Sequence, residues 1–146
     1  MSIFDSFAIS ASALTAERLR LDLISNNIAN INSTGRPNDP AQEPYRRKVP
    51  VFAQMLKRVQ AGDGVRYGFR GAGVKMAAVL EDNSPPRLVH DPDHPHAGER
   101  GFVAYPDINI VREMVDAMTA TRAYEANVTA LNAAKDIALQ ALEIGR

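Results

Sequence analysis

Residues 107–146 read DINIVREMVDAMTATRAYEANVTALNAAKDIALQALEIGR. This stretch contains no proline, and its only glycine is Gly145. A mostly apolar series follows alternating steps of four and three, and Lys135 is its one charged member. The series contains Ile110, Met114, Ala117, Thr121, Tyr124, Val128, Leu131, Lys135, Ala138 and Leu142. Such a heptad spacing predicts one long amphipathic helix with a coiled-coil-like seam.

The length of this helix argues for an extended subunit. A helix of about 36 residues rises about 54 Å, whereas a compact chain of this size has a diameter of roughly 38 Å. Part of the apolar seam would then be uncovered, although burying each large side chain stabilises by about 1.5 to 3 kcal/mol. We therefore expect other protein chains to cover it.

A second set of small residues lies about 100° round the same helix. This set contains Ala120, Ala123, Ala130, Ala134, Ile137 and Ala141. Two interpretations remain open: the small side chains let a second helix approach closely, or they reflect only the high helix propensity of alanine.

Residues 1–34 form the other helical zone, because they contain neither proline nor glycine. An apolar stripe with helical spacing, interrupted by Arg18, contains Phe7, Ala11, Leu14, Leu21, Ile24, Ile28 and Ile31. It predicts a helix from about residue 4 to about residue 31, with Gly35 as its C-terminal cap. The asparagines of residues 26–32 either fray the helix end or form a specific polar lock between subunits.

All nine prolines and eight of the nine glycines lie in residues 35–106. This middle zone predicts short strands at residues 45–52, 73–80, 87–90 and 101–105, separated by turns such as residues 62–64. Residues 54–60 are compatible with a helical turn or with more strand.

The expected fold class is therefore mostly α with a small central β module. Two long N- and C-terminal helices pack as a coiled-coil-like pair, and the domain boundaries fall at residues 1–34, 35–106 and 107–146. The two terminal zones are the expected assembly layers.

Composition excludes several function classes. The 17 basic and 17 acidic residues give a formal charge of zero, so nothing indicates a nucleic-acid partner. There is no cysteine, which excludes a disulfide framework and a thiolate metal site. The start of the chain lacks the pattern of a cleaved signal peptide, and no apolar run is long enough for membrane insertion.

Few residues of the sequence suggest a catalytic or metal-binding site. Residues 90–96 place His90, His94 and His96 beside two aspartates, a ligand set that suits zinc. Pro92 and Pro95 force a turning backbone there, so a surface turn is the preferred interpretation and a metal-dependent hydrolase the minor alternative. We predict no enzyme activity, no catalytic residue, no metal and no cofactor.

The asparagine run SNNIANIN of residues 25–32 resembles the N-terminal signature of bacterial flagellar rod and hook proteins. The segments DPDHP (91–95), GFVAYP (101–106) and residues 113–146 resemble the same family. Two departures are the loop of residues 35–44 and Asp107, which stands where the family pattern has asparagine before the final helix.

This resemblance implies a structural subunit of the proximal axial rod in the flagellar basal body, which transmits torque from motor to hook. It implies self-association into a helical rod, other rod proteins and the rod-base adaptor as partners, and type III export to the periplasmic or cell-wall space without a cleaved signal peptide. A cytoplasmic coiled-coil adaptor or secretion chaperone is the alternative function.

The expected contacts are interfacial, either within the subunit or between subunits. The predicted assembly interface contains Leu14, Leu21, Ile24, Asn27, Ile28, Met114, Tyr124, Asn127, Val128, Leu131 and Leu142.

Overall fold

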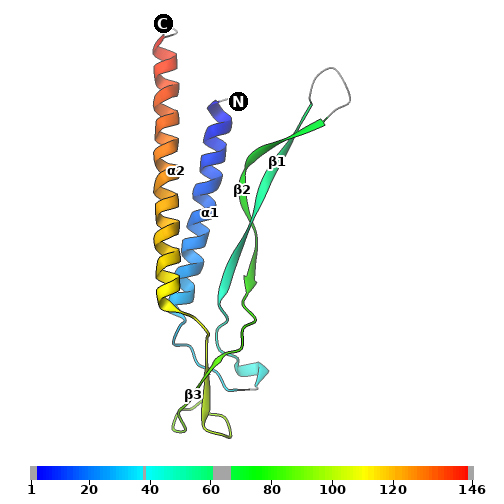
Figure 1. Ribbon diagram of the computed structural model, residues 1–146, viewed down its shortest axis with the longest axis vertical. Helices are drawn as coiled ribbons and strands as arrows, with labels where there is room; N and C mark the ends of the chain where they lie inside the picture. The colour runs from blue at the N-terminus through cyan, green and yellow to red at the C-terminus, as the bar shows by residue number, and fades with distance from the viewer. Residues whose placement is uncertain (1–2, 38, 61–66, 145–146) are drawn as a thin grey trace. The chain divides into compact units, whose positions relative to one another are not determined.

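The computed structural model describes residues 3–37, 39–60 and 67–144. In these residues a helix lies at each end of the chain, with strands between them (Figure 1). The helices are α1 (Ile3–Ala29) and α2 (Ile110–Ile144). Between them come the short 3-10 helix η1 (Pro40–Gln42) and the strands β1 (Lys48–Gln60), β2 (Tyr67–Glu81), β3 (Arg87–His90) and β4 (Phe102–Tyr105). The prediction of two terminal helices around a β module is confirmed.

α2 begins at a well-formed cap. The side-chain oxygen of Asn109 accepts hydrogen bonds from the N–H groups of Val111 (3.0 Å) and Arg112 (3.2 Å). These N–H groups have no partner inside the helix, so the cap stabilises its first turn. Asparagine therefore caps this helix, at residue 109 and not at residue 107.

The prediction that Gly35 caps α1 is wrong. α1 ends at Ala29, and Gly35 instead forms an isolated antiparallel bridge with Ala104, with both backbone hydrogen bonds at 2.9 Å. A Cβ on Gly35 would collide with the backbone of Gln42 and Pro44. Glycine is needed here because the backbone passes too close for any side chain.

The strands form two separate pairs. β1 and β2 make one two-stranded sheet, and β3 and β4 make an antiparallel pair with Val89 opposite Val103. β3 covers the predicted residues, but the prediction that the strands are all short is wrong for β1 and β2, of 13 and 15 residues. The open segment 54–60 is strand, and the predicted turn at 62–64 lies outside the described residues.

The chain divides into two compact units, each built from distant segments. Unit 1 contains residues 1–20, 51–78 and 119–146, and unit 2 contains residues 21–50 and 79–118. Among the described residues, the buried apolar side chains include Ala16 and Ala120 in unit 1, and Ile24, Val103, Ala104 and Pro106 in unit 2. Each unit therefore has a small core. Neither described helix has a segment long and apolar enough to cross a lipid bilayer.

Candidate assembly site

A buried polar cluster holds unit 2 together around Asn27, which is 1% exposed. The side-chain oxygen of Asn27 accepts hydrogen bonds from the Lys48 N–H (2.9 Å) and the Tyr45 hydroxyl (3.0 Å). Its nitrogen donates to the Lys48 carbonyl (2.9 Å) and to Oε2 of Glu113 (3.1 Å). The amide thus uses both donors and both acceptor positions, and it joins the end of α1 to β1 and to the first turns of α2.

Glu113 is the second centre of this cluster and is fully buried. Its Oε1 accepts a hydrogen bond from Nε of Arg47 (2.7 Å) and lies 2.6 Å from Nη2 of the same side chain. Asp116 adds a longer ion pair to Arg47 at 3.7 Å. A two-point arginine contact together with the Asn27 amide compensates the carboxylate for the loss of water.

The backbone before and at the start of β1 supplies the other partners. Tyr45 and Arg47, two residues apart just before β1, bring their side chains to Asn27 and Glu113 respectively. Burial raises the pKa of Tyr45, and the negative charges of Glu81 and Glu113 raise it further. The phenol therefore stays protonated at neutral pH, and its O–H donates a hydrogen bond to the side-chain oxygen of Asn27.

The neighbouring asparagines behave differently from Asn27. The side-chain nitrogen of Asn26 donates to the Asp22 carbonyl (2.9 Å), and that of Asn30 donates to the Asn26 carbonyl (2.8 Å). Both contacts are local, one turn back along the chain. The asparagines were expected either to fray the helix end or to form a polar lock between subunits. The structure instead shows the Asn27 amide fully hydrogen-bonded within one chain, while Asn26 and Asn30 bond to the local backbone.

A second set of contacts between elements lies in unit 1, where β2 packs against α1. The Ser12 hydroxyl donates to the Ile9 carbonyl (2.6 Å) and accepts a hydrogen bond from the Val74 N–H (3.1 Å). Gly73 has a φ of 115°, and a Cβ there would collide with the Ser12 side chain. Asp5 and Arg70 add an ion pair at 3.3 Å. Serine and glycine together let the strand lie directly on the helix.

The residues of the predicted interface differ in exposure. Ile24 and Asn27 are buried, Met114 and Leu142 are exposed, and the others are intermediate: Leu14, Leu21, Ile28, Tyr124, Asn127, Val128 and Leu131. Asn27 meets Glu113, whereas the Asn127 side chain donates to the Ala123 carbonyl of its own helix (2.8 Å).

The covered face of α2 is turned relative to the predicted seam. Its less exposed positions include a series with steps of four and three: Glu113, Ala117, Ala120, Tyr124, Asn127, Leu131, Ala134 and Ala138. This series shares Ala117, Tyr124, Leu131 and Ala138 with the predicted seam, but replaces Met114 and Thr121 by Glu113 and Ala120. The face turns toward the alanine set because Glu113 must reach Arg47, and Ala120 is small enough to be fully buried.

This rotation leaves an apolar stripe on the first turns of α2. The stripe consists of Ile110, Val111, Met114, Val115 and Met118, whose side chains are 46% to 66% exposed. They recur with spacings of one, three and four residues, so they share one helical face. We call this face the apolar stripe.

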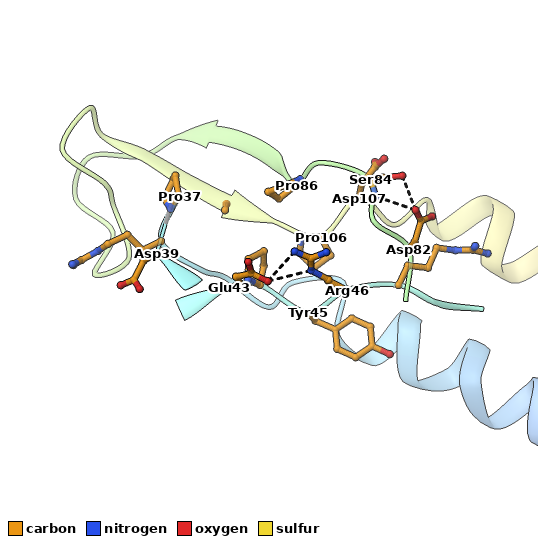
Figure 2. A pocket seen from close by; sticks show the side chains of 14 residues that line it. Pro37, Asp39, Glu43, Tyr45, Arg46, Asp82, Ser84, Pro86, Pro106 and Asp107 are labelled. Atoms are coloured by element: carbon orange, nitrogen blue, oxygen red, sulfur yellow. Dashed lines mark hydrogen bonds and ion pairs between the residues drawn. The ribbon is translucent and has the colours of Figure 1, made fainter. Parts of the chain in front are cut away.

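Unit 2 also contains a cavity of about 260 Å³, shown in Figure 2. Prolines and charged residues of both signs line it, and several are paired with each other. Oε2 of Glu43 accepts hydrogen bonds from Nε (3.2 Å) and Nη2 (3.0 Å) of Arg46. Asp82 accepts from the hydroxyl (2.7 Å) and N–H (3.0 Å) of Ser84, which lower the pKa of the Asp82 carboxyl. Mixed, internally paired charges do not single out a ligand chemistry.

The histidine loop is engaged in structural contacts. Nδ1 of His94 accepts a hydrogen bond from the His96 N–H (3.0 Å), and Nδ1 of His96 lies 2.9 Å from the Thr34 hydroxyl. The His90 ring packs edge-on against Phe102. In the described part of the chain, no group of three or more His, Cys, Asp or Glu residues is placed to hold a metal.

The sequence analysis missed Tyr45, Arg47 and Glu113 as functional residues. Glu113 lies outside the seam predicted from the sequence, so the periodicity of the helix gave no signal for it. No local pattern connects it to Arg47, which lies 66 positions earlier.

Comparison with known proteins matches both ends of the chain. The family described as "Flagella basal body rod protein" matches residues 7–36, and the one described as "Flagellar basal body rod FlgEFG protein C-terminal" matches residues 99–144. These ranges contain most of α1 and all of α2.

Relatives that match over the whole length of the chain indicate the same family. The flagellar basal-body rod protein FlgC of Bacillus subtilis (strain 168) is 42% identical, with all of both chains covered. The FlgC proteins of Borreliella burgdorferi (40%, 99% of this chain and 98% of the relative) and Escherichia coli O6:H1 (39%, all of both chains) are similarly close. With this identity over its whole length, the chain belongs to the FlgC family of flagellar basal-body rod proteins.

Proposed function

We propose that this chain is a structural subunit of the proximal rod of the flagellar basal body and works mechanically, not as an enzyme. It polymerises with copies of itself and with other rod proteins through its terminal helices, and the packed helices transmit torque from motor to hook. Membership of the FlgC family supports this role.

The observation that carries the proposal is the apolar stripe. Monomeric proteins rarely expose a contiguous row of large apolar side chains, and such rows mark interaction surfaces. Covering each of these side chains would stabilise an assembly by about 1.5 to 3 kcal/mol at full burial. The Asn27–Glu113–Arg47 cluster fixes the turns that carry the stripe, so the stripe is presented on a rigid support.

The proposed assembly has two helical layers. Residues 1–34 and 107–146 form them by coiled-coil-like pairing, within or between subunits, and residues 35–106 form an outer β-rich segment. The interface residues predicted from the sequence belong to these layers, and the rod-base adaptor is a proposed neighbour. Location across the periplasmic or cell-wall space and export without a cleaved signal peptide remain part of the proposal.

A pair of substitutions tests the stripe. Val111→Gln places a polar side chain within it, and Arg112→Gln places the same residue on an exposed position beside it. Both positions are exposed, so both variants should keep the thermal stability of the parent chain. We expect Val111→Gln to lose motility and Arg112→Gln to keep it, as measured in swimming assays. Equal motility of the two would remove the stripe from the interface.

The role itself is tested by mass spectrometry of purified hook and basal-body complexes. A rod subunit is present there in a fixed ratio to the other rod proteins. Absence from the complexes, with the chain recovered in the cytoplasm, would instead favour the adaptor or chaperone. Retention of stoichiometric zinc after dialysis would favour the hydrolase.

A further inference from the structure

The methionines of the described residues fall into two groups of different exposure. Met114 and Met118 of α2 are 50% and 57% exposed, whereas Met55 of β1 and Met76 of β2 are partly covered. Met55 is closely packed, since its Cε would lie 3.3 Å from a Cβ placed on Gly73. Because the chain has no cysteine, thioethers are its only sulfur groups. In the part of the chain that the structure describes, the most accessible of them lie on the first turns of α2.

The two exposed methionines occupy the middle of the apolar stripe. Each residue turns an α-helix by about 100°, so the stripe residues lie at about 60° to 200° from the buried Glu113. On this scale Met114 lies at about 100° and Met118 at about 140°, while Ile110 and Val115 lie at the two edges. A protein surface that covers the stripe must therefore bury both thioethers near its centre.

The buried cluster of unit 2 keeps this face of the helix outward. One carboxylate oxygen of Glu113 contacts Arg47 and the other contacts Asn27. Rotation of these turns to bury residue 114 would break both contacts and expose part of an apolar core. The two thioethers therefore stay accessible to solvent in the free subunit.

Sulfur is the reactive group of the stripe, because the isoleucine and valine side chains beside it are plain hydrocarbons. A sulfur lone pair attacks one oxygen of hydrogen peroxide, the O–O bond breaks, and water leaves. The sulfur is oxidised by two electrons and the peroxide is reduced. The product is methionine sulfoxide, which is polar where the thioether was apolar.

A sulfoxide at the centre of the stripe opposes docking. The centre of a protein interface is its most dehydrated part, and a polar group buried there without a hydrogen-bond donor is unfavourable. The neighbouring Ile110, Val111 and Val115 side chains offer no donor. Two sulfoxides one helical turn apart would place two such groups in the same contact.

We propose that Met114 and Met118 form an oxidation site that controls assembly. Peroxide converts them to sulfoxides in the free subunit, and the oxidised subunit no longer docks its apolar stripe on another rod subunit. A methionine sulfoxide reductase reverses the change: a dithiol becomes a disulfide, and the sulfoxide oxygen leaves as water. The proposal rests on the proposed rod function.

The reactivity of the two methionines is tested on the purified full chain with limiting hydrogen peroxide. Trypsin cuts after Arg112 and Arg122, so residues 113–122 form one peptide that contains both. Fragment mass spectra should show oxygen added to Met114 and Met118 several-fold faster than to Met55 and Met76. Equal or slower oxidation of the α2 pair would overturn the proposal.

The effect on assembly is tested in flagellated cells whose only copy of the chain is induced with or without peroxide. Basal bodies are counted by electron microscopy, and each strain is compared with its own untreated culture. Peroxide should lower the count several-fold for the parent chain but little for the Met114→Leu, Met118→Leu double variant, because leucine has no sulfur to oxidise. The matched control, Met55→Leu with Met76→Leu, should stay as sensitive as the parent.

A second measurement needs no variant. After peroxide treatment of the parent strain, unassembled copies should carry sulfoxide in residues 113–122, and copies in newly built basal bodies should carry much less. Equal sulfoxide content in the two pools would show that oxidised subunits assemble normally.

The outcomes separate this inference from the rod function. If peroxide lowers the count equally in all three strains, or not at all in the parent, Met114 and Met118 do not control assembly and the rod function stands. Absence of the parent chain from untreated basal bodies overturns both.

Discussion

The carboxamide of Asn27 contacts three parts of unit 2 at once. Its oxygen faces Tyr45 and the Lys48 N–H, while its nitrogen faces the Lys48 carbonyl and the Glu113 carboxylate. Only a side chain with both a donor and an acceptor end fits these partners. The roles of Asn27 and of the exposed Asn26 are therefore distinguishable by experiment.

Asn27→Asp keeps the shape of the side chain but puts a carboxylate oxygen where an N–H group met Glu113. Two carboxylates then face each other in a buried site, and we expect the free energy of unfolding to fall by about 3 kcal/mol. The deficit should shrink as the pH falls into the carboxyl range, because protonation of one group removes the repulsion. Urea unfolding at several pH values measures both effects. Asn26→Asp, at an exposed position, is the control and should change the stability by less than about 0.5 kcal/mol.

Gly73 gives the corresponding prediction for unit 1. Gly73→Ala combines a left-handed φ of 115° with a collision against Ser12, so it should destabilise by about 2 kcal/mol or more. Gly71→Ala is the matched control, since its Cβ would meet only the Gln54 side chain at an ordinary 3.4 Å. Denaturant unfolding compares them. An equal loss of unfolding free energy in the two variants would contradict the close packing of β2 on α1 at Gly73.

At the scale of elements, α2 has faces of different exposure. One side is covered and rich in small residues, the first turns expose the apolar stripe, and the C-terminal half exposes Ile137, Leu139, Leu142 and Ile144. A helix of 35 residues with so many exposed apolar side chains gains stability from neighbours more than from its own propensity. The assembled rod should therefore order α2 more firmly than the isolated chain does.

Leu131 lies on the covered side and tests the helix layers. Leu131→Asp should abolish rod assembly, because burying an unpaired carboxylate costs several kcal/mol. Ala130→Asp, at the exposed neighbouring position, should be tolerated better. Swimming assays and electron microscopy of basal bodies provide the measurement, and normal motility of Leu131→Asp would count against packing of this face.

At the scale of the whole molecule, charge balance and exposed apolar surface act together. The formal charge is zero at pH 7 and the isoelectric point is about 6.8, so copies of the chain do not repel each other near neutrality. We expect self-association of the purified protein to be strongest close to this pH and weaker well below and well above it. Sedimentation velocity across a pH series tests this, and oligomers that do not respond to pH would show that net charge has no part in association.

The sequence by itself determined both helices, β3 and the family resemblance. Heptad spacing and the absence of proline and glycine are local signals, because residues three and four apart are neighbours in a helix. The same local signals underestimated β1 and β2, since Gly68, Gly71 and Gly73 argue against a strand unless a helix supports it.

Only the tertiary structure decided which face of α2 is covered and what the asparagine run does. The pairing of Asn27 with Glu113 joins residues 86 positions apart, and neither residue carries a local trace of the other. A buried carboxylate fixes the rotation of a helix more strictly than an apolar side chain, because its partners must meet it at hydrogen-bond distance while apolar contacts tolerate turning. For this reason periodicity predicted the presence of α2, and the Asn27–Glu113–Arg47 cluster set the rotation of its first turns within unit 2.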